Sequence, residues 1–370
     1  MSSQDPSAAS RLWVSSPGRI CLFGEHQDYL LLPVIPAAIS LRISIGGFQR
    51  DDREVLLDLP DIDSTERFSL DGPLTYRAER DYFRSAVNVV RREGFTFSRG
   101  LQCTVRGEIP INSGTSSSSA LTVSWINFLT RASDQHRALD ALEIARLAHA
   151  AEVLEFHEPG GMMDHYSTSC GGVLAIDFVP RVRVENLRPR LGAFVLGNSG
   201  EPKDTKQILA RVKNQVLTAV DQLRKRFDDF SLQTVRSDSL ERYRSLVSPA
   251  QFELLGGTVK NRDITRRALE LLRKAEIDHR AIGRLLTDHQ TVLGEILRIS
   301  TPKIDRMLNA ANAAGAYGGK INGSGGGGCM LAYAPEQTDA VARAIEKAGG
   351  KARVVTVDEG TRVDRPEGDR

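Results

Sequence analysis

The sequence predicts an α+β protein built from two domains, and three observations support this prediction. The chain has 370 residues, which is too long for one compact core. Strand patterns dominate up to about residue 190, whereas helical patterns dominate beyond residue 200. Because the two kinds of pattern are segregated and do not alternate, an α+β arrangement is favoured over a doubly wound sheet. We therefore expect one domain over residues 11–190 and a second over residues 191–360.

The composition is that of an ordinary globular protein. Hydrophobic residues make up 41% and charged residues 26% of the chain, and the net charge of +2 gives no reason to expect nucleic acid or an anionic membrane as a partner. Residues 1–10 are polar, without an apolar signal core, and no apolar run approaches the ~20 residues that span a bilayer. These features predict a cytoplasmic protein. The cysteines are too widely spaced for a zinc site or a disulfide framework, and small buried thiols are expected at Cys21, Cys103, Cys170 and Cys329.

The first 200 residues contain eight extended patterns and three helical patterns. Short apolar and β-branched runs predict strands at residues 12–14, 19–23, 30–45, 55–59, 67–70, 101–105, 171–178 and 193–197. The fourth and fifth of these runs are expected to form a hairpin on an exposed edge. Apolar side chains at helical spacing predict helices at residues 81–92, 120–129 and 138–156.

The rest of the chain is mainly helical. Helical patterns occur at residues 203–230, 240–246, 264–275, 282–299 and 338–348. Residues 320–334 predict a strand, a Gly-rich loop and a second strand, and residues 352–357 predict a final strand. Tails are expected at residues 1–10 and 362–370.

The most informative loop is the Ser-rich run between residues 110 and 119, which opens the helix after residues 101–105. It reads Pro-Ile-Asn-Ser-Gly-Thr-Ser-Ser-Ser-Ser. Free backbone N–H groups, hydroxyls and the positive end of a helix dipole make such a loop a site for phosphate. It is not the common P-loop, because no Gly-Lys-Ser/Thr closes it. A plain helix cap or a linker is the alternative.

A second loop places three titratable side chains in four positions, directly after an apolar strand. These side chains are Glu25, His26 and Asp28. Sugar hydroxyls both donate and accept hydrogen bonds, so rigid carboxylates and an imidazole suit a sugar acceptor. The alternative is a polar turn. A zinc site is disfavoured because no second His lies at useful spacing.

Two further segments have unusual sequences. Residues 323–328 contain five glycines, which are expensive in chain entropy and exceed what a simple hairpin needs. We expect this loop to let the backbone approach a ligand. In the other segment, Asp164 follows Gly160 and Gly161, and a carboxylate after such a turn can accept the proton of a hydroxyl. A helix N-cap is the alternative for Asp164.

Together these segments resemble the GHMP kinase superfamily, which includes galactokinase, homoserine kinase, mevalonate kinase and phosphomevalonate kinase. The three ordered motifs of that family all occur here, between residues 17 and 329. The first is most similar to galactokinase, Pro-Gly-Arg-Val-Asn-Leu-Ile-Gly-Glu-His-Thr-Asp-Tyr. The matching positions are Pro17, Gly18, Arg19, Gly24, Glu25, His26, Asp28 and Tyr29. The resemblance implies a two-domain GHMP kinase fold, with an N-terminal ribosomal protein S5 domain 2-like part and a C-terminal ferredoxin-like α/β-plait with added helices.

The resemblance also implies an activity, ATP-dependent transfer of the γ-phosphoryl group to the C1 hydroxyl of galactose or a related sugar. Asp164 would act as the base, with Arg19 near the transferred group. The sugar would be bound by Glu25, His26, Asp28 and Gly161. Magnesium would be held by Ser118, or by a neighbouring Ser if the register is shifted by one, and by Glu152, which precedes Asp164 by twelve positions as in galactokinase. The residues implied for ATP are Pro110, Asn112, Ser113, Gly114, Thr115, Ser116, Ser117, Ser118, Ser119 and Gly325.

Several positions depart from the galactokinase pattern. Residues 30–32 are Leu-Leu-Leu where Asn-Gly-Gly is usual, and Asn112 stands where Gly is usual. The Gly-rich loop and residues 198–205 and 300–305 look more like mevalonate kinase. A mevalonate-type kinase and a non-catalytic sensor of sugar and ATP therefore remain alternatives, although Glu25 and Asp28 favour a neutral polyol. We expect a monomer or weak homodimer that binds a small sugar and ATP, and neither nucleic acid nor membrane.

Overall fold

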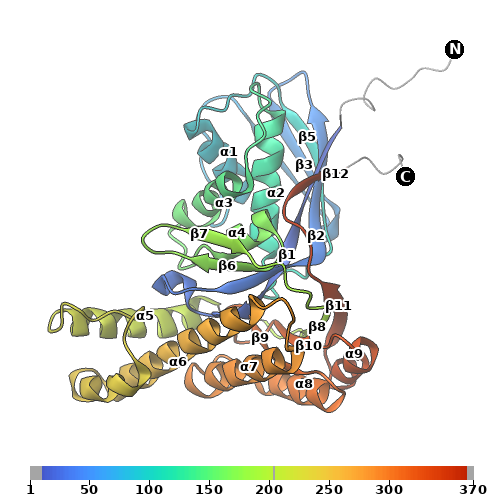
Figure 1. Cartoon of the computed structure of the whole chain (residues 1–370). Coiled ribbons are helices and arrows are strands. Elements are labelled where there is room, and N and C mark those ends of the chain that lie inside the picture. The colour runs from blue at the N-terminus through green and yellow to red at the C-terminus, as the bar shows by residue number, and fades with distance from the viewer. Residues whose placement is uncertain (1–10, 203–204, 365–370) are drawn as a thin grey trace.

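The structure is a computed structural model that describes residues 11–202 and 205–364. The expected N-terminal tail, residues 1–10, lies outside the described residues, as do two residues of the 198–205 run. One part of the molecule contains the larger sheet with helices α1 to α4, and the other contains the smaller sheet and the long helices α5 to α8 (Figure 1). This arrangement confirms the predicted α+β class. We propose the division into residues 11–190 and 191–360.

The larger sheet has the strand order β12-β1-β2-β5-β3-β4. Its long central pair is β1 (Leu12–Phe23) and β2 (Ile35–Gln49), followed by β5 (Leu101–Gly107). The predicted edge hairpin is confirmed as β3 (Glu54–Leu59) and β4 (Ser64–Ser69). The two predicted runs at residues 12–14 and 19–23 are one strand. The pairing shifts register between Pro17 and Gly18, and such a bulge accommodates Pro within a strand.

Four helices pack on one face of this sheet (Figure 1). They are α1 (Tyr82–Arg92), α2 (Ser117–Ala132), α3 (Ala141–His149) and α4 (Met163–Cys170). The predicted helix over residues 138–156 is shorter and ends in a π-helical turn, Ala150–Leu154. Helix α4 was not predicted, because its polar and β-branched residues have no apolar periodicity. Strand β6 (Leu174–Asp177) pairs with β7 (Arg183–Asn186), which was not predicted either.

The smaller sheet has the strand order β11-β8-β10-β9. Its members are β8 (Ala193–Asn198), β9 (Gly318–Asn322), β10 (Cys329–Tyr333) and β11 (Lys351–Thr356). The helices that pack against it are α7 (His279–Thr291), α8 (Pro302–Ala313) and α9 (Thr338–Lys347), whereas α5 (Thr205–Arg224) and α6 (Pro249–Leu272) pack on each other and extend away from it (Figure 1). Residues 318–333 thus confirm the predicted strand, Gly loop and strand.

Several helix boundaries differ from the prediction. Helix α6 begins fifteen residues before residue 264, with a capping box formed by Ser248 and Gln251, and its interior Gly256 and Gly257 obscure the helical pattern. Residues 237–246 form a 3-10 helix, Ser237–Leu246. The predicted helix over residues 282–299 changes to a π-helical turn at Val292–Ile296.

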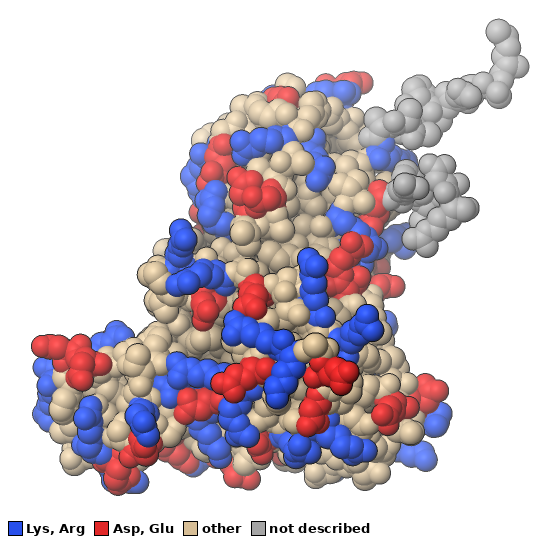
Figure 2. Space-filling model, viewed as in Figure 1, with Lys and Arg blue, Asp and Glu red and all other residues tan. Residues whose placement is uncertain are grey.

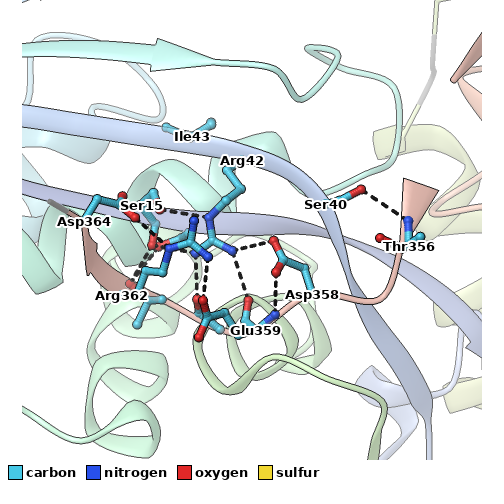
Figure 3. A network of polar contacts seen from close by, with 12 residues as sticks. Ser15, Ser40, Arg42, Ile43, Thr356, Asp358, Glu359, Arg362 and Asp364 are labelled. Carbon is cyan, nitrogen blue, oxygen red and sulfur yellow. Dashed lines mark hydrogen bonds and ion pairs between the residues drawn. The ribbon is translucent and has the colours of Figure 1, made fainter. Parts of the chain in front are cut away.

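The C-terminal end of the described chain returns to the larger sheet, which corrects the expected tail at residues 362–364; residues 365–370 lie outside the described residues. Strand β12 (Arg362–Asp364) pairs antiparallel with β1. On β2, Arg42 donates hydrogen bonds to Ser15, to Asp358 at 2.8 Å and to the carbonyls of Glu359 and Gly360, as Figure 3 shows in part. This network fastens the segment between β11 and β12 across the junction of the two parts.

The surface and the cysteines agree with the composition. On the face shown in Figure 2, Lys and Arg side chains are interspersed with Asp and Glu over the C-terminal helices. Within residues 11–202 and 205–364, no helix is long and apolar enough to span a membrane. All four cysteines are free thiols; Cys21, Cys103 and Cys329 are buried, and Cys170 is partly exposed.

Candidate active site

A cleft of about 850 Å³ brings most of the predicted site residues together. The predicted residues that line it are Arg19, Glu25, His26, Asp28, Asn112, Ser113, Gly114, Ser116, Ser117, Ser118, Ser119, Glu152, Gly161 and Asp164. Three predicted residues, Pro110, Thr115 and Gly325, do not line the cleft but support the loops that do. The Ser113 hydroxyl bonds both Pro110 and Thr115, at 2.7 and 2.9 Å, and a Cβ on Gly325 would collide with Ile299. These three residues shape the loops from behind.

The Ser-rich loop leaves the start of α2 open. Asn112, Gly114 and Ser116 all have positive φ angles, so the chain winds tightly before the helix begins at Ser117. The N-cap residue Ser116 makes no side-chain cap bond within the described residues. The first N–H groups of a sixteen-residue helix therefore face the cleft with the positive end of its dipole, which is the arrangement that binds phosphate.

Arg19 and Asp164 form a two-pronged ion pair at the centre of the cleft. Arg19 Nε lies 2.9 Å from Asp164 Oδ1, and Nη2 lies 2.8 Å from Oδ2. The third nitrogen of Arg19 donates to the carbonyl of Gly114 in the Ser-rich loop. Burial alone would raise the pKa of Asp164, but the charge of Arg19 and the Ser116 hydroxyl hold it below its usual value. Asp164 is therefore ionised at neutral pH and directly connected to the phosphate side.

The position of Asp164 in its helix excludes the alternative that it is a helix cap. Asp164 lies in the first turn of α4, whose N-cap residue is Met162. Its side chain is 29% exposed, whereas that of Arg19 is 5% exposed. A partly exposed carboxylate held by a buried guanidinium is available to a ligand in the cleft.

Asp28 lies against the Gly160-Gly161 turn. Its carboxylate accepts hydrogen bonds from the N–H groups of Tyr29, at 2.9 Å, and Met163, at 3.3 Å. A Cβ on Gly161 would stand 2.0 Å from Asp28 Oδ2, so glycine is required there for the close approach. Burial and the nearby charge of Asp164 raise the pKa of Asp28 to about 6.

Glu25 and His26 connect the N-terminal loop to the Gly-rich loop. Glu25 pairs with Lys320 Nζ at 2.9 Å and also accepts the N–H of Gly323. His26 bonds the Tyr29 hydroxyl at 2.8 Å and the Ser324 carbonyl at 3.0 Å through its two ring nitrogens. Asn322 and Lys320 are site residues that sequence reasoning missed. Asn322 bonds the N–H of Cys21 and the carbonyl of Gly114, both at 2.8 Å.

Glu152 and Ser118 lie on opposite elements of the same cleft. Glu152 belongs to the π-helical turn after α3 and bonds His165 Nε2 at 2.8 Å, whereas Ser118 is exposed in the first turn of α2. Within the described residues, no group of three or more His, Cys, Asp or Glu side chains could hold a metal ion by itself. A carboxylate and a hydroxyl are nevertheless the hard oxygen donors that suit Mg²⁺ shared with substrate phosphates.

Three family models match this chain. GHMP kinases N terminal domain covers residues 81–172, GHMP kinases C terminal covers residues 268–351, and the galactokinase galactose-binding signature covers residues 5–46. The first two models cover the Ser-rich loop and the Gly-rich loop, and the third covers the loop that carries Glu25, His26 and Asp28.

Mevalonate kinases and galactokinases are both among the similar proteins. A mevalonate kinase from Thermococcus onnurineus is 28% identical over 364 residues, covering 96% of this chain and 98% of that protein. A galactokinase from Haemophilus influenzae is 27% identical over 371 residues, covering 95% and 94%. The structure of Lactococcus lactis galactokinase complexed with galactose aligns with a TM-score of 0.81 at 22% identity, covering 96% of this chain and 95% of that one. The last likeness concerns the fold alone.

Proposed function

Because this chain belongs to the GHMP kinases, a family of ATP-dependent kinases of small molecules, we propose that its acceptor is a neutral sugar. The reaction is transfer of the γ-phosphoryl group of ATP to the anomeric hydroxyl of galactose or a closely related sugar. Galactose is suggested by the galactokinase signature over residues 5–46.

The balance of charge in the cleft carries this proposal. The carboxylates that line the cleft are Glu25, Asp28, Glu152, Glu158 and Asp164. The arginines that line it in the described structure are Arg19 and Arg80, and each is already paired, Arg19 with Asp164 and Arg80 with Glu158 at 2.8 Å. Among the lining residues that the structure describes, an anionic acceptor would meet this negative charge and no unpaired Lys or Arg. Hydroxyl groups, in contrast, donate readily to carboxylates.

The geometry supports a direct transfer mechanism. Asp164 would orient the acceptor hydroxyl and receive its proton, and Arg19 would stabilise negative charge as the phosphoryl group moves. The open N-terminus of α2 would hold the phosphates on the side of the Arg19–Asp164 ion pair opposite the acceptor. Because phosphoryl transfer can be loose, positioning and electrostatic stabilisation supply most of the rate enhancement, and proton removal can come late.

Sugar binding and metal binding are assigned to the residues beside the Arg19–Asp164 ion pair. Asp28, held over Gly161, would accept a sugar hydroxyl, and Glu25 and His26 would complete the sugar side. Glu152 and Ser118 would hold Mg²⁺, which supplies charge neutralisation on the phosphates when it is bound with ATP.

A mevalonate-type kinase is the second candidate, favoured by the Thermococcus relative and by the Gly-rich loop sequence. Mevalonate carries a carboxylate, so this candidate needs a cation beside the acceptor. Lys213 is a cation near the acceptor loop, but it donates to the Pro159 carbonyl at 3.0 Å and lies over the Tyr29 ring. It could serve a carboxylate only by leaving these contacts.

The test is ADP release by the purified protein with ATP and one acceptor at a time. The acceptors are galactose, other hexoses, pentoses, uronic acids and mevalonate. Release with galactose or another neutral sugar, and none with mevalonate, is the expected result. Release with mevalonate alone would overturn the proposal in favour of the second candidate, and ATP binding without turnover on any acceptor would point to a sensor.

A further inference from the structure

We infer that Lys320 is a positioning residue for the acceptor: it holds Glu25 and the start of the Gly-rich loop in one fixed arrangement. This inference rests on the proposed function, because it assigns Glu25 to the acceptor side of the kinase site. Lys320 lies on β9 in the C-terminal part, 295 positions after Glu25 in the chain. It therefore joins the first and third motifs across the two parts of the molecule.

All the hydrogen-bonding capacity of Lys320 is used inside the protein. Its ammonium group donates to Glu25 Oε2 at 2.9 Å and to the carbonyls of Cys21 and Ile321, both at 2.8 Å. An ammonium has three hydrogens, and each has an acceptor here. The exposed fraction of the Lys320 side chain is 0% and that of Glu25 is 2%.

Such a pair is expensive to bury, which argues for a role beyond stability. Removing two charges from water carries a large desolvation penalty for each ion, and an apolar pair of similar size would often be at least as stable. The buried pair borders the cleft, because Glu25 lines it. A rigid carboxylate at this place has a use if it must present its remaining lone pairs to a hydroxyl.

Lys320 is the ion-pair partner of Glu25 in the part of the chain that the structure describes. Its second oxygen accepts the N–H of Gly323, the first residue of the Gly-rich loop. Each carboxylate oxygen has two lone pairs, so Glu25 retains capacity for a ligand after both bonds are made. Without Lys320, the buried Glu25 carboxylate would lose its ion-pair partner and would no longer be held in this position.

The Gly-rich loop needs an anchor of this kind. Gly323, Gly325, Gly326, Gly327 and Gly328 all have positive φ angles, so the loop has little conformational restriction of its own. Its beginning is held by Glu25 at Gly323 and by His26 at Ser324. Lys320 thus fixes Glu25, and through Glu25 it also fixes the start of the Gly-rich loop at Gly323.

The experiment compares the KM for the acceptor with kcat in Lys320→Met and Lys320→Gln. We expect the KM for galactose to rise about tenfold or more, the scale of losing a hydrogen bond to a charged group. We expect kcat and the Kd for a non-hydrolysable ATP analogue to stay within about threefold of wild type. Lys320→Gln keeps a hydrogen-bond donor and serves if the Met variant does not fold.

A double-mutant cycle with Glu25→Gln separates positioning from a general loss of packing. Because Lys320 acts through Glu25, the acceptor KM of the double variant should be no higher than the higher of the two single-variant KM values. Arg84→Met is the matched control: it removes a buried cation of α1 that is 4% exposed, pairs with the N-cap residue Asp81 and does not line the cleft. We expect Arg84→Met to lower Tm and to leave the acceptor KM and the Kd for the ATP analogue unchanged.

Three results would overturn the inference. These are an unchanged acceptor KM in a folded Lys320 variant, KM effects of Lys320 and Glu25 that multiply, and an equal KM effect of Arg84→Met. Wild-type activity on galactose tests the proposed function separately. The ratio of variant to wild-type KM can be measured with whichever acceptor the wild type uses, so the two failures are distinguishable.

Discussion

The two sides of the cleft are built in different ways. On the phosphate side, residues 112–119 form one continuous segment without a charged side chain, and the open N-terminus of α2 supplies main-chain donors. On the acceptor side, charged groups come from distant segments and are held in pairs, as in Arg19 with Asp164 and Glu25 with Lys320. The first side depends on backbone shape, whereas the second depends on individual side chains. Side-chain substitutions that preserve the backbone shape, at positions other than the proposed Mg²⁺ ligand Ser118, should therefore cost less on the phosphate side than on the acceptor side.

The largest expected effect is that of Asp164→Asn on the acceptor side. The amide keeps the size of the side chain but cannot take the hydroxyl proton, and it weakens the ion pair with Arg19. We expect turnover to fall by at least ~100-fold, the usual scale for loss of a general base, with ATP binding retained. Steady-state kinetics and the binding of a non-hydrolysable ATP analogue measure the two quantities. Near-normal turnover would remove Asp164 from the role proposed for it.

The next largest effect is expected from Gly161→Ala, with the adjacent Gly160 as its control. In Gly161→Ala the new Cβ would stand 2.0 Å from Asp28 Oδ2, so the carboxylate must move. We expect the KM for the acceptor to rise about tenfold, as for a lost hydrogen bond to a charged group. Gly160→Ala is the control, because its Cβ would meet only Val153, at an ordinary 3.6 Å. Equal effects of the two substitutions would contradict the role of Asp28.

A third prediction concerns pH. Burial and the charge of Asp164 raise the pKa of Asp28 to about 6, so protonation of Asp28 below this pH should raise the acceptor KM by up to about tenfold per pH unit. Asp28→Asn should remove this dependence. A profile of kcat/KM that is the same for both proteins between pH 5 and 7 would argue against Asp28 as a hydroxyl acceptor.

The same shift has a consequence for stability. The folded state binds this proton more tightly than the unfolded state, whose pKa is near 3.8, so ionisation of Asp28 costs stability as the pH rises through about 6. Asp28→Asn should therefore raise Tm more at pH 8 than at pH 4. Thermal unfolding of both proteins at the two pH values measures the difference, and the opposite order would contradict the burial argument.

The smallest effect is expected on the phosphate side. Ser117 lies in the first turn of α2, and the proposed contact there is its N–H group, which Ser117→Ala preserves. We expect the Kd for ATP to change by less than about threefold. A large loss of ATP affinity would mean that hydroxyl groups, and not the main chain, bind the phosphates. The contrast between the two sides would then fail.

This contrast also explains what the sequence could predict. The Ser-rich loop, the edge hairpin and helix α1 are local features, and residue types over ten or twenty positions predict them. The placement of Asp164 and Arg19 at the reacting group was also expected, because both residues belong to recognisable motifs. Helix α4 was missed because it is short and polar, and the start of α6 because Gly256 and Gly257 weaken the pattern.

Long-range partners could not be predicted from local patterns. Lys320 reads as an ordinary residue at the start of a strand, and only the packing of β9 against the N-terminal loop brings it to Glu25. Asn322 is similar, since its partners Cys21 and Gly114 are both far away in the chain. Strand β12 was mistaken for a tail because its pairing with β1 depends on the whole fold.

The most direct test of the account is the ratio of kcat/KM for galactose to kcat/KM for mevalonate, measured with the same preparation. Among the described lining residues, the arginines are already paired and the other charged groups are carboxylates, so the cleft should strongly prefer the neutral acceptor. We predict a ratio above about 100, corresponding to a difference of nearly 3 kcal/mol in transition-state stabilisation. A ratio below about 1, which means that mevalonate is the better acceptor, would contradict the claim that the acceptor side is built for a neutral sugar.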